Sequence, residues 1–513
     1  MKNVNKKNLK TNPLSHIGTI ISKAREDNRM TQNDLAEKIG TTQSVIARIE
    51  KGEQNLSTET LSKISKALNK EIISFAGKGT VNFRIEGGHK LSGKIKVRTS
   101  KNGAVGVLCA SLLNKNTTTI KNAPKIEEVY RIIEVLESIG VKVEWKNNDL
   151  IIIPPKKILI EKIDKENASK TRSAIMILGP LIHEFKKFNI PQAGGCKLGS
   201  RTVKPYFYAL EKLGVNIITK TDHYIVENKK LNNAEIILYE AGDTVTETIL
   251  TAAAGIDGKT IIKFASSNYQ VQDVCFYLEK LGVKVEGIGT STLTVYGKEN
   301  IDIRVEYSVS EDPIEAMSLI TAAIMTKSSI TIERCPIDFL EIELLKLEKM
   351  GFKYKILKRY KADNGKTNLV DILTYTSELK ALDEKIHAMP YPGLNIDNLP
   401  FFAVIGAQAE GQTFIHDWTY DYRAVYFKEL EKLGADTILS DPHRFYIKGP
   451  TKFKAAEMLC PPALRPSVII MLAMLAADGI SILRNVYNIN RGYEDLAERL
   501  NSIGAHIETF RDL

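Results

Sequence analysis

The sequence predicts an α/β protein of two domains with three repeated units each, preceded by a small all-α domain. Three observations lead to this fold class. The chain of 513 residues is too long for one compact core, and about two to four domains are expected. A Leu-Glu-x-x-Gly pattern followed by alternating apolar residues returns six times after residue 80, the last copy in weaker form. The first 75 residues carry short helical patterns with capping signals instead.

The all-α domain is predicted over residues 1–75. The segment Thr31–Asp34 has the form of a capping box that begins a short helix, and Gly40 is a natural end for that helix. Thr42 is expected to cap a second helix over residues 43–51. Two short helices joined by a tight turn are typical of a helix-turn-helix. The domain holds thirteen Lys/Arg and eight Asp/Glu, so about half of the net charge of +10 lies in it.

The pattern of these two helices resembles the Cro/repressor-type helix-turn-helix family. The resemblance is carried by Thr31-Gln32-x-x-Leu35-Ala36-x-x-Ile39-Gly40 followed by Thr42-Gln43-Ser44-x-Ile46-x-x-Ile49-Glu50. In that family the second helix enters the major groove, where Gln and Arg can read adenine and guanine. The resemblance implies duplex DNA as a partner, a possible dimer through this domain, and contacts from Gln32, Thr42, Gln43, Ser44 and Arg48. A helical bundle that makes only protein contacts stays an alternative.

The chain after a predicted linker at residues 76–81 is expected to consist of six α/β units. In each unit a helix ends at a glycine and the chain continues into a strand, as in Gly140 followed by residues 141–144. Units of about 70 residues are long for a solenoid, so two globular domains of three units are favoured. The six helix-ending glycines are Gly140, Gly214, Gly282, Gly351, Gly434 and Gly504.

Composition excludes several classes of protein. Hydrophobic content of 43% with 26% charged residues is typical of a globular chain. The longest apolar run, residues 468–477, is about half of the roughly 20 residues that span a bilayer, and the N-terminus lacks an apolar signal core. A cytoplasmic protein without a membrane partner is therefore expected. Five scattered cysteines without a C-x-x-C pair, and dispersed histidines, indicate neither a disulfide framework nor a metal site.

One loop has the composition of a reactive site. Residues 193–201 contain three glycines and one cysteine, Cys196, with Lys197 and Arg201 beside it. Neighbouring cations lower the pKa of a thiol, and a glycine-rich loop gives it access to solvent. Cys196 is therefore expected to be the reactive thiol, whereas an inert buried thiol is the alternative. Cys109, Cys275 and Cys460 lie in apolar settings instead.

Short motifs are spread in a fixed order through residues 82–513. They are Phe83-Arg84-Ile85-x-Gly87, Ser100-Lys101-Asn102, Lys170-Thr171-Arg172-Ser173-Ala174, Gly194-Gly195-Cys196 with Gly199 and Arg201, Asp312, Tyr391-Pro392-Gly393 with Asp397, Arg423, and Arg491-Gly492-Tyr493-Glu494. Their order and spacing resemble the family of UDP-N-acetylglucosamine 1-carboxyvinyltransferases, which are enolpyruvyl transferases.

The resemblance implies a two-domain inside-out α/β barrel, the enolpyruvyl transferase fold, with the active site in the cleft between the domains. One domain would comprise residues 82–99 and 303–513, and the other residues 100–302 with the catalytic cysteine loop. The chain would then cross twice between the domains, and a hinge there would close the cleft against water. The transferase body is expected to be monomeric.

The implied reaction transfers the enolpyruvyl group of phosphoenolpyruvate to the 3-hydroxyl of UDP-N-acetylglucosamine and releases phosphate, without a cofactor. Several cations must bind the two anionic groups of phosphoenolpyruvate. By resemblance, Cys196 delivers a proton to the methylene carbon, Asp312 removes one from the sugar hydroxyl, and Lys101 and Arg423 are also catalytic. The implied substrate-binding residues are Lys101, Asn102, Arg172, Arg201, Lys204, Asp312, Asp397 and Arg423.

The sequence departs from the family pattern at the nucleotide end. Lys204 stands where the family has Asp, and Glu240 stands where a Lys reaches the UDP phosphates. Gly242-Asp243 replaces Ser-Val, and residues 268–270, Asn-Tyr-Gln, replace Glu-Pro-Glu. A carboxylate that faces a diphosphate is repelled by it. Two alternatives therefore stay open: a transcriptional regulator whose transferase-like domain senses a cell-wall nucleotide or phosphoenolpyruvate without turnover, and a related transferase with a different acceptor.

Overall fold

The computed structural model describes residues 80–192, 194 and 202–511, together with residues 18, 21–26, 28, 30–51, 54, 60, 63–64 and 67–68. The chain divides into two compact units. The N-terminal unit comprises Met1–Thr80 with Arg511–Leu513, and the body comprises Val81–Phe510. In the described part of the chain, no helix combines the length and apolar character that crossing a bilayer requires.

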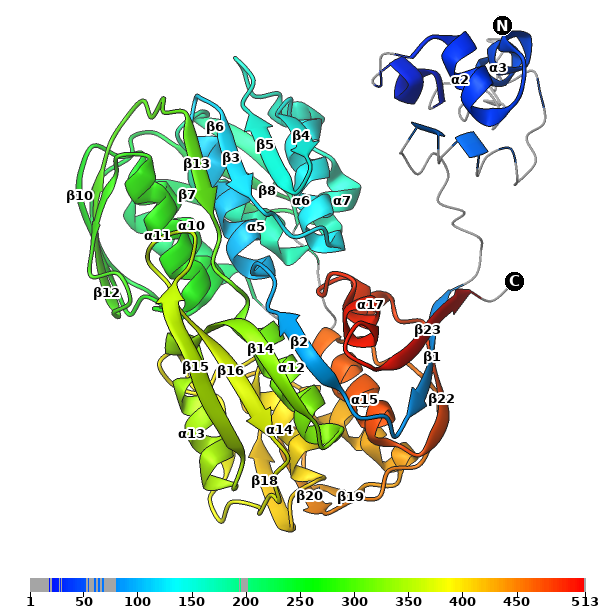
Figure 1. Cartoon of the computed structure of the whole chain (residues 1–513). Helices are drawn as coiled ribbons and strands as arrows, with labels where there is room; N and C mark the ends of the chain where they lie inside the picture. Colours follow the sequence, from blue (N-terminus) through cyan, green and yellow to red (C-terminus); the bar gives the residue numbers. More distant parts are fainter. Residues whose placement is uncertain are drawn as a thin grey trace, which may run out of the picture. The chain divides into compact units, whose positions relative to one another are not determined.

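The N-terminal unit contains the two predicted helices of the helix-turn-helix, α2 (Gln32–Ile39) and α3 (Gln43–Glu50) (Figure 1). The capping box is confirmed, because the Thr31 hydroxyl accepts from the Asp34 N–H and the Asp34 carboxylate accepts from the Thr31 N–H. Gly40 ends α2 in the left-handed region, at a φ of 74°. Thr42 occupies the N-cap position of α3 but makes no capping hydrogen bond; its hydroxyl lies 3.1 Å from that of Ser44.

The apolar faces of these helices form a separate small core. Arg25 reinforces it from one side, because its guanidinium makes a largely buried ion pair with Glu50, with an Nε to Oε1 distance of 2.6 Å. Burial of such a pair restricts how α3 can rotate against the preceding chain. The buried core residues are Ile21, Ala24, Leu35, Ala36, Ile46, Ile49, Ile64 and Leu68.

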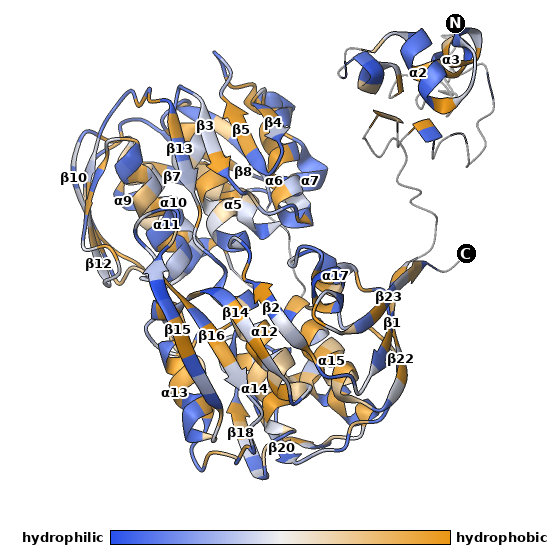
Figure 2. Ribbon diagram, in the orientation of Figure 1, coloured by the Kyte–Doolittle hydropathy of each residue, from blue (hydrophilic) through white to orange (hydrophobic). Residues whose placement is uncertain are grey.

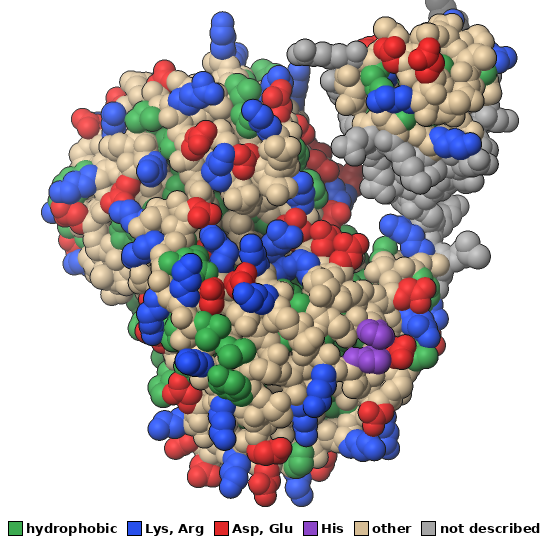
Figure 3. Space-filling view, viewed as in Figure 1, with side chains coloured by type: hydrophobic (Ala, Val, Ile, Leu, Met, Phe, Trp, Pro, Cys, Tyr) green, Lys and Arg blue, Asp and Glu red, His purple; other side chains and the backbone are tan. Residues whose placement is uncertain are grey.

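The body has two lobes, each with its own hydrophobic core. The N-lobe core runs from Ala104 to Val309. The C-lobe core combines Phe83–Val97 with residues 314–507, and it also includes the side chain of Tyr269. Lys and Arg are interspersed with Asp and Glu over the displayed face of the body, which is typical of a solvated surface (Figure 3).

Each lobe is covered by three small sheets (Figure 1). Within each sheet the strands are named in the order in which they pair. The three N-lobe sheets are β13 (Val305–Ser308), β3 (Thr118–Lys121), β5 (Asp149–Ile153) and β4 (Lys142–Lys146); β6 (Lys187–Pro191), β8 (His223–Asn228) and β7 (Val215–Thr219); and β11 (Lys284–Glu286), β12 (Thr292–Gly297), β10 (Gly258–Lys263) and β9 (Glu235–Ile237). The three C-lobe sheets are β15 (Lys353–Lys361), β16 (Asn368–Tyr375), β14 (Ser329–Pro336) and β2 (Ser92–Lys96); β17 (Ile386–His387), β18 (Gly411–His416), β20 (Arg444–Gly449) and β19 (Asp436–Leu439); and β21 (Glu457–Leu459), β22 (Gly479–Arg484), β1 (Val81–Gly87) and β23 (His506–Arg511).

Apolar helices fill the centre of each lobe, so the predicted inside-out arrangement is confirmed. Every residue of α12 and α14 is buried. Helices that are apolar on all sides must be covered all round, and here the sheets cover them (Figure 2). The inner helices are α5 (Lys101–Ala110), η3 (Arg172–Ile177) with α8 (Leu178–Leu181), and α10 (Asp243–Ala254) in the N-lobe, and α12 (Pro313–Met325), α14 (Leu399–Gly406) and α15 (Leu464–Ala476) in the C-lobe.

The six predicted repeats are confirmed as six units that each continue from an inner helix to a strand, an outer helix, a glycine and two strands. The six glycines all have φ between 81° and 105°, a region that glycine enters without the steric cost of a Cβ atom. The outer helices are α6 (Glu127–Ser138), α9 (Lys204–Lys212), α11 (Tyr269–Lys280), α13 (Glu341–Lys349), η5 (Arg423–Leu433) and α17 (Leu496–Asn501). In the last unit the second strand is β1, from the start of the body.

Two chain segments connect the lobes, and they run side by side. The Ser100 N–H donates to the Ser310 carbonyl at 2.8 Å, and the Asp312 N–H donates to the Arg98 carbonyl at 2.9 Å. The strand β13 pairs with β3 in an N-lobe sheet, so the second connection follows residue 308, a few residues beyond the expected boundary at 303. Residues that follow these two connections are therefore brought together.

Candidate active site

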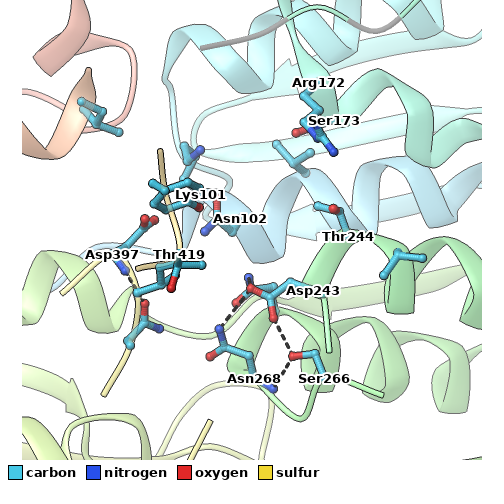
Figure 4. Close-up of a pocket in the computed structure, with 18 of the residues that line it drawn as sticks. Lys101, Asn102, Arg172, Ser173, Asp243, Thr244, Ser266, Asn268, Asp397 and Thr419 are labelled. Carbon is cyan, nitrogen blue, oxygen red and sulfur yellow. Dashed lines mark hydrogen bonds between the residues drawn. The ribbon is translucent and has the colours of Figure 1, made fainter. Parts of the chain in front are cut away.

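A cleft with a volume of about 1060 Å³ lies between the lobes and is lined by residues of both. Figure 4 shows Lys101, Asn102 and Asp397 close to one another, and Asp243, Ser266 and Asn268 joined in a second polar group. The two groups differ in charge and in hydrogen-bonding character.

The first group begins at α5, where Lys101 is the first residue after the first connection. Its ammonium donates to a carboxylate oxygen of Glu128 on α6 at 2.9 Å. Burial opposes ionisation of Glu128, but Lys101 and Arg491 outweigh this effect and lower its pKa to about 2. Glu128 therefore stays ionised at neutral pH and holds the ammonium of Lys101 at the cleft.

The C-lobe contributes two buried arginines that face Asp397. Arg465, near the start of α15, lies 3.2 Å from Asp397 Oδ2 and donates to the Tyr493 hydroxyl at 2.8 Å. Arg423, at the start of η5, places Nη1 3.8 Å from Asp397 Oδ1. Burial opposes ionisation of Asp397, yet Arg465, Arg423 and Lys101 hold its pKa below the usual value. The cleft therefore concentrates cations around one ionised carboxylate.

Asp312 lies at the second connection, close to the N-terminus of α5. Its carboxylate accepts from the N–H groups of Ile314 and Glu315, which makes Asp312 the N-cap of α12. Its other oxygen is 3.4 Å from the Lys101 amide nitrogen. Burial raises the pKa of Asp312, and Glu315 adds to this effect while Arg465 opposes it. The side chain is 6% exposed and does not line the cleft wall.

Tyr269 links the lobes beside this group. Its ring belongs to the C-lobe core and packs edge-on against Phe339, while its hydroxyl accepts from the Asn102 side chain of the N-lobe at 2.9 Å. Burial raises the pKa of Tyr269 well above its ordinary value, with Asp312 and Asp397 adding to the shift. The hydroxyl therefore stays neutral and fixes the orientation of Asn102.

The second polar group surrounds Asp243, the first residue of α10. Its carboxylate accepts from the Ser266 hydroxyl at 2.5 Å, the Gln270 amide at 2.6 Å and the Asn268 amide at 3.2 Å. Glu247 lies one turn further along α10, is 2% exposed and also lines the cleft. Burial, with Asp243 and Asp273 nearby, raises the pKa of Glu247 well above its ordinary value.

The structure brings together most of the substrate-binding residues predicted from the sequence. Lys101, Asn102, Arg172, Asp397 and Arg423 line the cleft. Lys204 is exposed and lies outside the cleft wall, whereas Glu240 lines it. Cys196 and Arg201 lie outside the described residues.

Sequence reasoning missed four residues of the site: Glu128, Tyr269, Arg465 and Arg491. Arg491 belongs to the last of the sequence motifs, and it lines the cleft. Arg465 precedes the most apolar run of the chain, and a charge in that place is a sign of a buried functional group. Glu128 has no comparable signal, because nothing in the sequence places α6 beside Lys101.

The remaining cysteines are unreactive by position. Cys109, Cys275, Cys335 and Cys460 are free and buried. Burial raises the pKa of each of these thiols, to about 11 for Cys460, so little thiolate forms near neutral pH.

One group outside the cleft contains residue types that bind metals. Glu86, His89 and His506 place one potential ligand atom each within 4.8 Å of the others. The two imidazoles stack with ring centroids 3.9 Å apart and planes inclined by 17°. His89 Nε2 lies 3.3 Å from a carboxylate oxygen of Glu86.

Comparisons with known proteins identify the family of the body. The family model described as EPSP synthase (3-phosphoshikimate 1-carboxyvinyltransferase) matches residues 85–500, and a helix-turn-helix model matches residues 21–75. The body is 32% identical over 428 residues to a UDP-N-acetylglucosamine 1-carboxyvinyltransferase of Bradyrhizobium diazoefficiens. This alignment covers 83% of this chain and 98% of the relative. A protein of that name from Campylobacter hominis is 33% identical over 427 residues, with the same coverage. The chain therefore belongs to the carboxyvinyl transferase family and carries an additional helix-turn-helix domain.

Solved structures agree on the fold. The enolpyruvyl transferase NikO from Streptomyces tendae aligns with a TM-score of 0.74 at 22% identity and covers 85% of this chain and all of its own. An EPSP synthase from Acinetobacter baumannii aligns with a TM-score of 0.64 at 20% identity and covers 84% of this chain.

Proposed function

We propose that the body transfers the enolpyruvyl group of phosphoenolpyruvate to the 3-hydroxyl of UDP-N-acetylglucosamine, with release of phosphate. The observation that carries this proposal is the convergence of Lys101, Arg423 and Arg465 around Asp397 in one interlobe cleft. Phosphoenolpyruvate has two anionic groups, and guanidinium and ammonium groups match them. The names of the curated relatives supply the acceptor.

Each step can be assigned to a residue. The acceptor hydroxyl attacks C2 of phosphoenolpyruvate while C3 takes a proton from the Cys196 thiol, and the Asp312 carboxylate removes the hydroxyl proton. C3 then returns a proton to the Cys196 thiolate while phosphate leaves with its bridging oxygen and takes the proton held by Asp312, and the enol ether forms. The raised pKa of Asp312 supports its role as base. Movement at the two paired connections would bring Asp312 to the substrate. Arg172 and Arg201 add positive charge for the phosphate groups, and Asn102 and Asp397 orient the acceptor.

The test is phosphate release by the full chain with both substrates, and mass spectrometry of the product. Lys101→Ala should reduce kcat/KM at least about a hundredfold, because a charge that binds the reacting anion is lost. Lys259→Ala removes an exposed lysine outside the cleft and should leave the rate unchanged. Binding of both substrates without release of phosphate would favour the alternative of a sensor domain in a transcriptional regulator.

We also infer that residues 1–75 bind duplex DNA. Thr42, Gln43 and Ser44 are exposed at the start of α3, and Arg48 is exposed in its last turn. The Gln43 side chain donates to Gln32 at 2.6 Å, and Gln32 donates to Glu50 at 2.8 Å, so the potential base-reading amides are held in one chain of hydrogen bonds. Preorganisation of this kind favours specific contacts over flexible ones.

Selection from a random duplex pool tests the DNA interface. Binding should weaken as salt rises, and Gln43→Ala or Arg48→Ala should relax the selected sequence. Lys38→Ala, which removes an exposed charge from α2, should leave the selected sequence unchanged. Recovery of no enriched sequence would leave a protein-contact domain. We further propose that the chain dimerises through this unit while the body itself is monomeric. The proposed location is the cytoplasm, where DNA and both phosphorylated substrates are found.

A further inference from the structure

A group of three residues on the outer surface of the C-lobe combines two imidazoles with a carboxylate. Glu86 belongs to β1, His89 lies in the turn between β1 and β2, and His506 begins β23. None of the three lines the cleft. Figure 3 shows histidine side chains next to an acidic side chain on the displayed face. The first and last strands of the body therefore meet at residue types that bind transition metals.

The backbone of the turn after β1 holds two members of the group together. Gly87 and Gly88 turn the chain back after Glu86, and His89 Nε2 lies 3.3 Å from a Glu86 carboxylate oxygen. Gly88 has a φ of 82°, and a Cβ atom on Gly87 would overlap backbone carbonyl oxygens at the end of α15. Larger residues would strain this turn at both positions. The approach of His89 to Glu86 is therefore set by the backbone.

His506 completes the group from the neighbouring strand, because β23 lies beside β1 in its sheet. Its ring stacks on the ring of His89. No described residue forms a hydrogen bond with the His506 imidazole, so its nitrogens are open to a ligand. Arg84 and Glu508 pair at 3.6 Å across the same two strands, which balances the positive charge of Arg84. The group therefore offers one carboxylate and two imidazoles to a cation.

The spacing of the ligand atoms is close to the spacing around a bound zinc ion. Zn²⁺ holds nitrogen and oxygen ligands at about 2.0–2.2 Å in tetrahedral geometry, so two ligand atoms lie roughly 3.3–3.6 Å apart. One ligand atom from each of Glu86, His89 and His506 lies within 4.8 Å of the other two. The His89 side chain is 37% exposed and His506 is exposed, so both rings can turn toward an ion without moving the core.

We propose that Glu86, His89 and His506 bind one Zn²⁺ ion, with water in the fourth position. Two imidazoles favour a transition metal over Mg²⁺ and Ca²⁺, which prefer oxygen ligands. The ion joins β1 to β23, an edge strand of its sheet, and stabilises the last unit of the body. The dispersed histidines of the sequence indicated no metal site, because His506 reaches the other two residues only through the sheet. The site is separate from the cleft, and the inference does not depend on the proposed reaction.

Titration of Zn²⁺ into the full chain, after removal of metals with a chelator, tests the site. Competition with a chromophoric zinc chelator should show an ion that His89→Gln and His506→Gln each bind at least about tenfold more weakly, because loss of even an outer partner of a ligand costs about 10- to 100-fold. His223→Gln is the matched control and should leave the affinity unchanged, because it also removes an imidazole beside a carboxylate, 2.7 Å from Asp222. Cys196→Ser should keep the affinity as well, which excludes the loop thiol as a ligand.

Hydrogen exchange shows where the ion acts. Zn²⁺ should slow exchange of the β1 and β23 amides in the wild-type chain and in His223→Gln but not in His506→Gln, and Mg²⁺ should have no effect. Exchange of the variants without zinc should match that of the wild-type chain, because the substituted side chains lie at the surface. Zinc affinity that survives the loss of either histidine, or wild-type strands whose exchange zinc does not slow, would overturn the inference and leave the proposed reaction intact.

Discussion

The guanidinium of Arg423 is held by both carboxylate oxygens of Asp417, with Nε 2.5 Å from Oδ2 and Nη2 2.9 Å from Oδ1. Both side chains are fully buried, Nη2 also donates to the Ile396 carbonyl, and the guanidinium lies over the Tyr420 ring. With Nε and Nη2 engaged, Nη1 is the nitrogen that faces Asp397 and the cleft. Asp417 therefore determines which edge of Arg423 is offered to a substrate.

Replacing Asp417 tests this positioning role. Asp417→Asn should destabilise the fold by about 3–5 kcal/mol, because it leaves a buried guanidinium without its counter-charge. It should also raise the KM for phosphoenolpyruvate more than it lowers kcat, since Arg423 keeps its charge but loses its orientation. Urea unfolding and steady-state kinetics measure the two effects. Asp478→Asn, which removes an exposed carboxylate from a salt bridge on the same lobe, is the control. If Asp417→Asn leaves the free energy of unfolding unchanged, the Arg423–Asp417 ion pair contributes nothing to stability.

Removing the Tyr269 hydroxyl tests the link between the lobes. Tyr269→Phe preserves the ring that packs on Phe339 but takes away the acceptor of the Asn102 amide. The KM for the acceptor should rise about two- to tenfold, which corresponds to one neutral hydrogen bond, while the KM for phosphoenolpyruvate stays constant. The effects of Tyr269→Phe and Asn102→Ala should not be additive in the double variant, because both remove the same contact. Additive effects would mean that the hydroxyl and the amide act independently.

The ion pair of Glu128 with Lys101 predicts a pH dependence of stability. The pKa of Glu128 in the folded chain is about 2, below the ordinary value of 4.5, so the ionised carboxylate stabilises the fold above about pH 4.5. This contribution is lost as the pH falls from 4.5 toward 2. Glu128→Gln should therefore be less stable than the wild-type chain by about 1–3 kcal/mol at pH 7, and the difference should shrink below pH 4.5. Urea unfolding at pH 7, 5 and 3.5 measures it, and a difference that does not depend on pH would contradict the assignment.

Thiol labelling tests the reactive cysteine. Iodoacetamide should modify Cys196 in the native chain within minutes, and phosphoenolpyruvate should slow the reaction. The other four cysteines are buried, and their raised pKa values keep them as thiols. Peptide mass spectrometry identifies the site, and Cys196→Ser is the control that should stay unlabelled. Equal labelling of Cys335 would contradict the prediction.

The sequence by itself determined the features that depend on neighbouring residues. The capping box of Thr31 with Asp34, the helix-ending glycines such as Gly140, and the six-unit repeat are encoded within a few positions, because helix ends and strand patterns are set by local backbone energetics. The order of the motifs was enough to indicate the family. It also indicated five substrate-binding residues that line the cleft in the structure. The inside-out arrangement followed from that resemblance, and the apolar character of α12 and α14 explains it.

Only the tertiary structure decided which charges meet. Asp312 lies beside Lys101 although 211 positions separate them, because the two connections between the lobes run side by side. Tyr269 enters the C-lobe core from an N-lobe helix, and Glu128 reaches Lys101 from the outer helix of the same unit. Such contacts depend on how separately folded units pack, and packing is set by the summed shape of many buried side chains. Local sequence patterns contain no measure of that shape, so the positioning residues of the site appear only once the units are assembled.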